Sequence, residues 1–86
     1  MFVILTYDVA AKRTGKILRV CRKYLHHEQK SVFEGSLTTA KLQRLKDELK
    51  KWIVVKEDSV NIYEFDTLRY SAKEQIGRNS QCDHIL

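Results

Sequence analysis

The run FVILTYDV at residues 2–9 is apolar almost throughout and rich in residues that favour β-strands. Such a run is typical of a central strand that is buried on both faces of a sheet. Asp8 stands near the end of this run, where the strand is expected to emerge from the core. Two roles are open for its carboxylate: to bind Mg²⁺, which proteins often hold through one or two carboxylates, or to cap the loop that follows.

Two segments repeat their apolar residues with helical spacing. Between Lys12 and Leu25 the apolar positions share one stripe, and basic residues occupy most of the remaining surface. A second helix is expected to begin after Thr38 or Thr39, either of which can act as the N-terminal cap. The two stripes consist of Ile17, Leu18, Cys21, Tyr24 and Leu25, and of Leu42, Leu45, Leu49, Trp52 and Ile53.

Further strands are predicted on both sides of the second helix. One lies within residues 29–37, with a bulge expected at Gly35, and another covers residues 60–65. A separate short strand over residues 26–30 stays open, because no turn signal marks it. The order strand, helix, strand, helix, strand predicts an α+β sandwich in which both helices cover one face of a single sheet.

Composition limits the class of protein. A chain of 86 residues that is 43% hydrophobic and 31% charged is expected to form one globular domain. We expect residues 1–66 to form its core and residues 67–86 a polar tail, whose apolar end, Ile85-Leu86, docks on a partner subunit. No apolar run approaches the roughly 20 residues of a membrane span, so a cytoplasmic protein with no membrane partner is expected. Cys21 and Cys82 are expected to be free thiols.

The positive charge is unevenly distributed along the chain. The formal net charge of +5 lies entirely within residues 1–43, mostly between Lys12 and Lys30. A basic stripe of this kind is the electrostatic footprint of a polyanion such as nucleic acid, although a solvated helix face would look the same. The residues expected to contact nucleic acid are Lys12, Arg13, Lys16, Arg19, Arg22 and Lys23.

The residues alone indicate few side chains that could take part in catalysis. No second acid lies near Asp8 in the sequence, so a two-metal site within one chain is poorly supported. A symmetric dimer would change this, because a two-fold axis brings in a second Asp8. Ser31 has no evident base beside it and is expected to bond locally or to bind a phosphate. Phe33 is expected to be a core or interface residue.

Several segments, in order and with matching spacing, together resemble the family of CRISPR-associated protein two. The resemblance implies a ferredoxin-like βαββαβ fold with an additional C-terminal strand, and a homodimer in which that strand completes the partner's sheet. His27 departs from some members, which commonly have a basic residue there. The segments that carry the resemblance are Tyr7-Asp8-Val9, the basic helix opening near Arg13, residues 29–35, residues 58–63 and Ile76-Gly77.

The resemblance also implies function. Members have been described as metal-dependent endonucleases that act on RNA or double-stranded DNA, and as the bridge of the spacer-integration complex with a larger integrase subunit. By this resemblance Asp8 and its symmetry mate would bind Mg²⁺ at the dimer interface. The other positions that the resemblance ties to activity are Tyr7, Arg13, Phe33 and, in the same motif as Phe33, Ser31.

Three functions therefore stay open. The first is an Mg²⁺-dependent endonuclease, towards which the family resemblance leans. The second is a dimeric scaffold that binds duplex DNA, which the small number of acids near Asp8 favours. The third, less favoured by residues 31–35 and the tail, is a stand-alone ribonuclease toxin of the virulence-associated protein D type.

Overall fold

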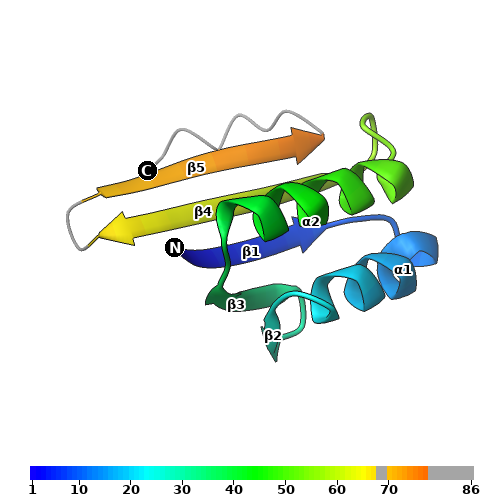
Figure 1. Cartoon of the computed structure of the whole chain (residues 1–86). Helices are drawn as coiled ribbons and strands as arrows, with labels where there is room; N and C mark the ends of the chain where they lie inside the picture. The colour runs from blue at the N-terminus through cyan, green and yellow to red at the C-terminus, as the bar shows by residue number, and fades with distance from the viewer. Residues whose placement is uncertain (68–69, 78–86) are drawn as a thin grey trace.

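The computed structural model describes residues 1–67 and 70–77, which form one antiparallel sheet and two helices (Figure 1). The strand order β2-β3-β1-β4-β5 places β1 at the centre. Strands β1 to β4 and the two helices have the connectivity of a ferredoxin-like βαββαβ fold, so the predicted fold class is confirmed. The elements are β1 (Phe2–Asp8), α1 (Ala11–Arg22), β2 (His26–Gln29), β3 (Val32–Ser36), α2 (Thr39–Trp52), β4 (Ser59–Thr67) and β5 (Tyr70–Gly77).

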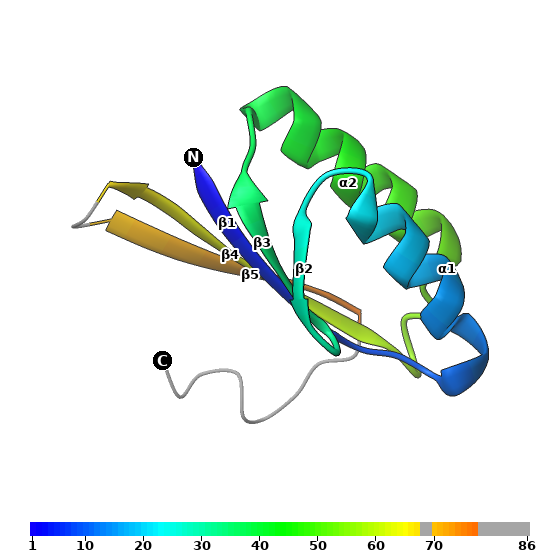
Figure 2. The same cartoon turned by 90° about the horizontal axis from the view of Figure 1, so that it is seen from below.

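Both helices cover the same face of the sheet, as predicted (Figure 2). Successive side chains of a strand point to opposite faces, and in β1 the residues Val3, Leu5 and Tyr7 are buried while Phe2 and Asp8 are exposed. The prediction that β1 is buried on both faces is therefore wrong for the single chain. Only one face has helices to cover it, and Asp8 belongs to the uncovered face.

The core lies between the helices and the covered face of the sheet. Helix α2 contributes the predicted leucines, and the hydroxyl of Thr38 caps it by accepting a hydrogen bond from the Lys41 N–H. Helix α1 also buries Val20, which the predicted stripe did not include. Trp52, which the stripe placed in the core, is 42% exposed because it is the last residue of α2. The largest fully buried side chains include Phe33, Leu5, Ile17, Leu45, Leu49 and Ile62.

The β2–β3 hairpin answers the question left open about residues 26–30. A short strand β2 does pair with β3, and the irregularity in their pairing falls between His27 and Gln29. The bulge expected at Gly35 is absent, because Gly35 pairs regularly with Val3. A Cβ at position 35 would lie 3.2 Å from the Leu25 side chain, so this glycine permits close packing rather than a bulge.

Strand β5 extends the sheet of its own chain by pairing with β4. Residues 70–77 of the expected tail are thus an edge strand of the domain. This strand ends at Gly77, which has φ +108 and lies so close to the Asp58 carbonyl oxygen that a Cβ would collide with it. Ile85-Leu86 and Cys82 lie outside the described residues, and docking of the tail on a partner stays a prediction.

Two further expectations concern the described residues only. Cys21 is a free, buried thiol as predicted, and its burial raises the pKa to about 12. Neither described helix is long and apolar enough to cross a bilayer.

Candidate functional site

A pocket of about 350 Å³ lies at the end of β1. Helix α1 bounds it on one side, through Thr14 and Leu18, and the turn between β2 and β3 bounds it on the other. Three of the predicted active-site residues, Tyr7, Asp8 and Ser31, line this pocket together. The sequence separates Asp8 from Ser31 by more than twenty positions, and pairing of β1 with β3 brings them together.

Asp8 is exposed and is the last residue of β1, as predicted. Its Cα partner in the neighbouring strand β4 is Ser59. Within residues 1–67 and 70–77, no three His, Cys, Asp or Glu side chains come together as metal ligands. A cation bound by the Asp8 carboxylate would have to take its remaining ligands from outside this set of side chains.

Lys30 lines the pocket next to Ser31, although sequence reasoning did not single it out as a site residue. Its φ is +22, which is uncommon for a residue other than glycine. Hydrogen bonds fix the backbone on both sides: the His27 ring donates through Nε2 to the Lys30 carbonyl at 2.7 Å, and the Tyr7 N–H donates to the Ser31 carbonyl at 3.2 Å. The hairpin turn is thereby held against the end of β1. The only signal in the sequence was the position of Lys30 beside Ser31.

Phe33 does not line this pocket but packs against Tyr7, which does. The ring is fully buried and stacks on Tyr7, with centroids 6.1 Å apart, and on His27, with centroids 4.5 Å apart. The prediction that Phe33 is a core residue is confirmed. Burial also raises the pKa of Tyr7, so its phenol stays protonated and can donate a hydrogen bond but not accept a proton near neutral pH.

Arg13 is held by two acids that directly precede β4. Its Nε and one terminal nitrogen bind Asp58, at 2.6 Å and 2.9 Å, and the same terminal nitrogen binds Glu57 at 2.7 Å. Asp58 is fully buried and also accepts the backbone N–H groups of Ala10 and Val54, each at 2.9 Å. We call the group of Arg13, Asp58 and these two N–H donors the clamp.

The clamp has a strong electrostatic signature. Its hydrogen bonds, above all those from Arg13, hold the pKa of Asp58 well below its usual range, and they raise the pKa of Arg13. The clamp fixes the loop that follows Asp8, because Ala10 belongs to that loop. Sequence reasoning did not identify Asp58 as a site-building residue, since its partner Arg13 is 45 positions away. A role for Arg13 in catalysis or nucleic-acid binding stays a prediction.

The remaining basic residues of α1 are exposed, as predicted. Some have partners within the chain: Lys23 forms an ion pair with Glu48, Lys16 lies over the ring of Trp52, and an Arg22 nitrogen lies 3.4 Å from Nδ1 of His27. The positive surface therefore lies along the helix layer, distinct from the pocket at the end of β1. These exposed residues are Lys12, Lys16, Arg19 and Arg22, together with Lys23 directly after the helix.

Comparison with known proteins gives concordant results. The sequence profile of the family described as "CRISPR associated protein Cas2" matches residues 1–73. A Thermotoga maritima protein named "CRISPR-associated endoribonuclease Cas2" is 46% identical over 77 residues, covering 90% of this chain and 88% of the relative. A Fusobacterium nucleatum protein of the same name is 40% identical over 92 residues, covering 100% of this chain and 87% of the relative.

Solved structures agree with the sequence comparison. A crystal structure described as that of Cas2 superposes with a TM-score of 0.75 at 36% identity, covering 94% of this chain and 91% of the other. Cas2 from Streptococcus pyogenes, crystallised at pH 6.5, superposes with a TM-score of 0.70 at 35% identity, covering 76% of this chain and 86% of the other.

Proposed function

The chain belongs to the CRISPR-associated Cas2 family, and we propose that it is a cytoplasmic, dimeric nucleic-acid-binding protein of CRISPR adaptation with Mg²⁺-dependent endonuclease activity on RNA or double-stranded DNA. The observation that carries this proposal is the pocket at the end of β1, where Asp8 lies with Lys30 and Ser31. The names of the curated relatives, which are endoribonucleases, support the cleavage activity. Membership of this family sets aside the toxin alternative.

Asp8 has the donor chemistry that Mg²⁺ prefers, because its ligand atoms are anionic oxygens. It is exposed at the end of a strand, where water and a phosphate can reach it. The remaining ligands would come from water, from the substrate phosphate and from the Asp8 of a second copy. When bound there, Mg²⁺ would supply Lewis-acid polarisation of a phosphodiester and a more acidic water.

The other pocket residues would bind and orient the substrate. The Lys30 ammonium and the Ser31 hydroxyl are hydrogen-bond donors to phosphate oxygens, and both line the pocket beside Asp8. The anchored hairpin turn would keep these donors in place without reorganisation on binding. In this mechanism Phe33 positions Tyr7 and has no direct contact with the substrate.

A second copy of this chain is the proposed partner of the uncovered sheet face. Phe2 and Phe65 lie on paired positions of β1 and β4, with ring centroids 6.4 Å apart, and they are 38% and 36% exposed. Alternation along β1 places Asp8 on the same face as Phe2. A two-fold dimer through this face would repeat every contact and bring two Asp8 carboxylates towards one axis.

The basic exterior of α1 favours a second candidate function, that of a bridge. The dimer would hold duplex DNA through the exposed lysines and arginines of α1 and would bind the larger integrase subunit of the adaptation complex. This role needs no chemistry at Asp8. Binding and cleavage can therefore be separated by mutation.

The experiment compares Asp8→Ala with Asp47→Ala, a matched loss of one exposed carboxylate on α2. Labelled RNA and duplex DNA are incubated with the wild type and both variants, with and without Mg²⁺, and light scattering measures the mass of each protein. We expect Asp8→Ala alone to lose Mg²⁺-dependent cleavage while remaining dimeric. Unchanged cleavage by Asp8→Ala contradicts the enzyme mechanism, whereas duplex binding by a wild type that cleaves nothing supports the bridge.

A further inference from the structure

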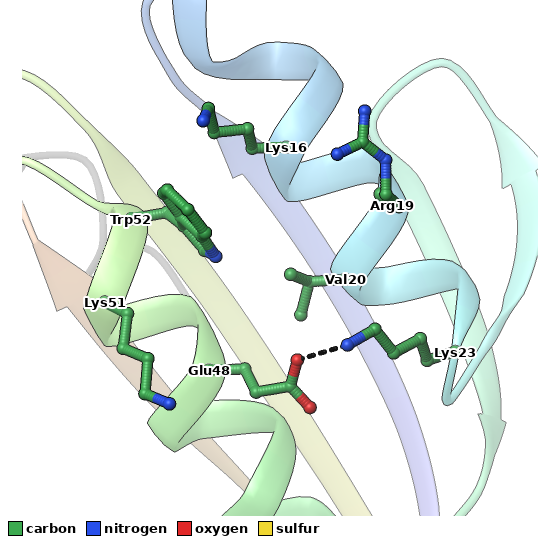
Figure 3. A pocket seen from close by; sticks show the side chains of 7 residues that line it. All are labelled: Lys16, Arg19, Val20, Lys23, Glu48, Lys51 and Trp52. Atoms are coloured by element: carbon green, nitrogen blue, oxygen red, sulfur yellow. Dashed lines mark hydrogen bonds and ion pairs between the residues drawn. The ribbon is translucent and has the colours of Figure 1, made fainter.

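A groove of about 420 Å³ lies between α1 and α2, on the helix layer (Figure 3). Its volume falls within the roughly 300–1,000 Å³ of ligand-binding sites. It shares no lining residue with the pocket at the end of β1. Its polar and aromatic lining consists of Lys16 and Arg19 from α1, Lys23 directly after α1, and Glu48, Lys51 and Trp52 from α2.

Positive charge dominates this groove, since four cationic side chains accompany one carboxylate. Glu48 is already engaged: it binds Lys23 at 2.6 Å and accepts a hydrogen bond from the Tyr24 hydroxyl. The contact with Lys23 is the main cause of its lowered pKa, so Glu48 stays ionised. Among the residues that the structure describes, Arg19 and Lys51 form no ion pair. The groove therefore has cations available for an anionic ligand.

Trp52 adds an aromatic surface to this charged groove. Lys16 Nζ lies 4.3 Å from the centroid of its ring, and 42% of the residue still remains exposed. Figure 3 shows the indole between the two helices, with its nitrogen directed into the groove. An exposed aromatic ring among cations is the arrangement by which proteins hold single-stranded nucleic acid, because bases stack on the ring while cations follow the phosphates.

We propose that this groove binds an unpaired nucleotide of a nucleic-acid strand, with its base on Trp52 and its phosphate among Lys16, Arg19 and Lys51. The inference rests on the proposed function in that nucleic acid is the ligand, and it adds a second surface at which an unpaired segment is held. In a duplex the bases stack on one another and expose no face to the indole. An acidic peptide would satisfy the cations but would leave the indole without a stacking partner.

Trp52 is the only tryptophan of the chain, so intrinsic fluorescence reports on this groove directly. The dimeric wild-type protein is titrated with a short oligothymidylate and with a duplex of matched length, while anisotropy of the labelled nucleic acid measures total binding. We expect the single strand to quench Trp52 with the same midpoint as the anisotropy change, and the duplex to quench it less. Trp52→Ala should weaken single-strand binding roughly 5- to 150-fold, the loss of one stacked base.

A matched pair of lysine variants tests the phosphate contact without touching the ring. Lys50→Ala and Lys51→Ala each remove one positive charge from the last turn of α2, but only Lys51 lines the groove. We expect Lys51→Ala to reduce the slope of log K against log salt for single strands by about 0.7, the value for one phosphate. Lys50→Ala should leave the slope at the wild-type value.

The outcomes separate this inference from the proposed function. Single-strand binding seen by anisotropy, with no change in Trp52 fluorescence and equal slopes for the two lysine variants, overturns the groove while leaving nucleic-acid binding intact. Failure to bind any single strand or duplex overturns both. A polyglutamate peptide that quenches Trp52 more strongly than the oligothymidylate overturns the assignment of the ligand.

Discussion

At the N-terminal end of α1, Arg13 Nε lies 2.6 Å from Asp58, and at the C-terminal end Lys23 Nζ lies 2.6 Å from Glu48. The side chains of the first pair are 12% and 0% exposed, and those of the second are 55% and 26% exposed. The distances are the same, so burial distinguishes the two pairs. Water and salt weaken an exposed pair, whereas breaking a buried pair leaves an uncompensated charge in the protein.

The difference in burial corresponds to the different contacts that the two pairs make at the two ends of α1. Asp58 binds the N–H of Ala10, two residues after Asp8, and the N–H of Val54, two residues after Trp52. The clamp therefore fixes the chain beside both candidate binding regions. Lys23 and Glu48 line the groove themselves, so the exposed pair can exchange partners when an anion enters. Burial makes one end of α1 a fixed support and exposure makes the other end adaptable.

The largest expected effect comes from breaking the clamp. Asp58→Ala should lower the free energy of unfolding by about 3–5 kcal/mol, because it leaves Arg13 and two backbone N–H groups without their acceptor. Urea unfolding followed by circular dichroism measures the change. Glu57→Ala is the control, because it removes the other acid that binds Arg13, whose side chain is 56% exposed. The free energy of unfolding of this variant should stay close to that of the wild type. Equal losses in the two variants would show that burial does not distinguish these acids.

Protonation of the Asp58 carboxylate at low pH should also remove the stabilisation that the clamp provides. The pKa of Asp58 is held below its unfolded value of about 3.9, so its stabilising contribution is complete above that pH. It is lost progressively as the pH falls through the unfolded value towards the folded one, because the unfolded chain then binds more protons. The free energy of unfolding of the wild type should therefore decline more steeply between about pH 5 and pH 3 than that of Asp58→Asn. Parallel curves for the two proteins would contradict the assignment of this carboxylate.

The smallest expected effect concerns the exposed pair. Lys23→Ala should leave the free energy of unfolding within experimental error of the wild type, because its side chain is 55% exposed and the pair is screened by solvent. Urea unfolding at low and at high salt measures this. A loss as large as that of Asp58→Ala, or one that salt does not reduce, would mean that the two ends of α1 are held alike.

Local patterns explain most of what the sequence predicted correctly. The helical stripes, the cap at Thr38 and the position of Asp8 at the end of β1 each depend on residues close together in the chain. The bulge expected at Gly35 was wrong. A glycine fits here because the Leu25 side chain, which follows the first helix, packs closely against the backbone of β3. Lys30 was missed as a site residue because its place in the pocket depends on the turn between two strands.

The sequence by itself determined the order of β1, α1, β3, α2 and β4, the apolar stripes and the positive charge of α1, because spacing and composition act over a few neighbouring residues. Only the tertiary structure decided which of two similar aspartates is buried. Asp58 is enclosed because the loop before β4 meets Ala10 and Arg13 at the start of α1, while Asp8 ends β1 on the face that no helix covers. Burial depends on which segments meet after folding, and those segments lie tens of residues apart in the chain.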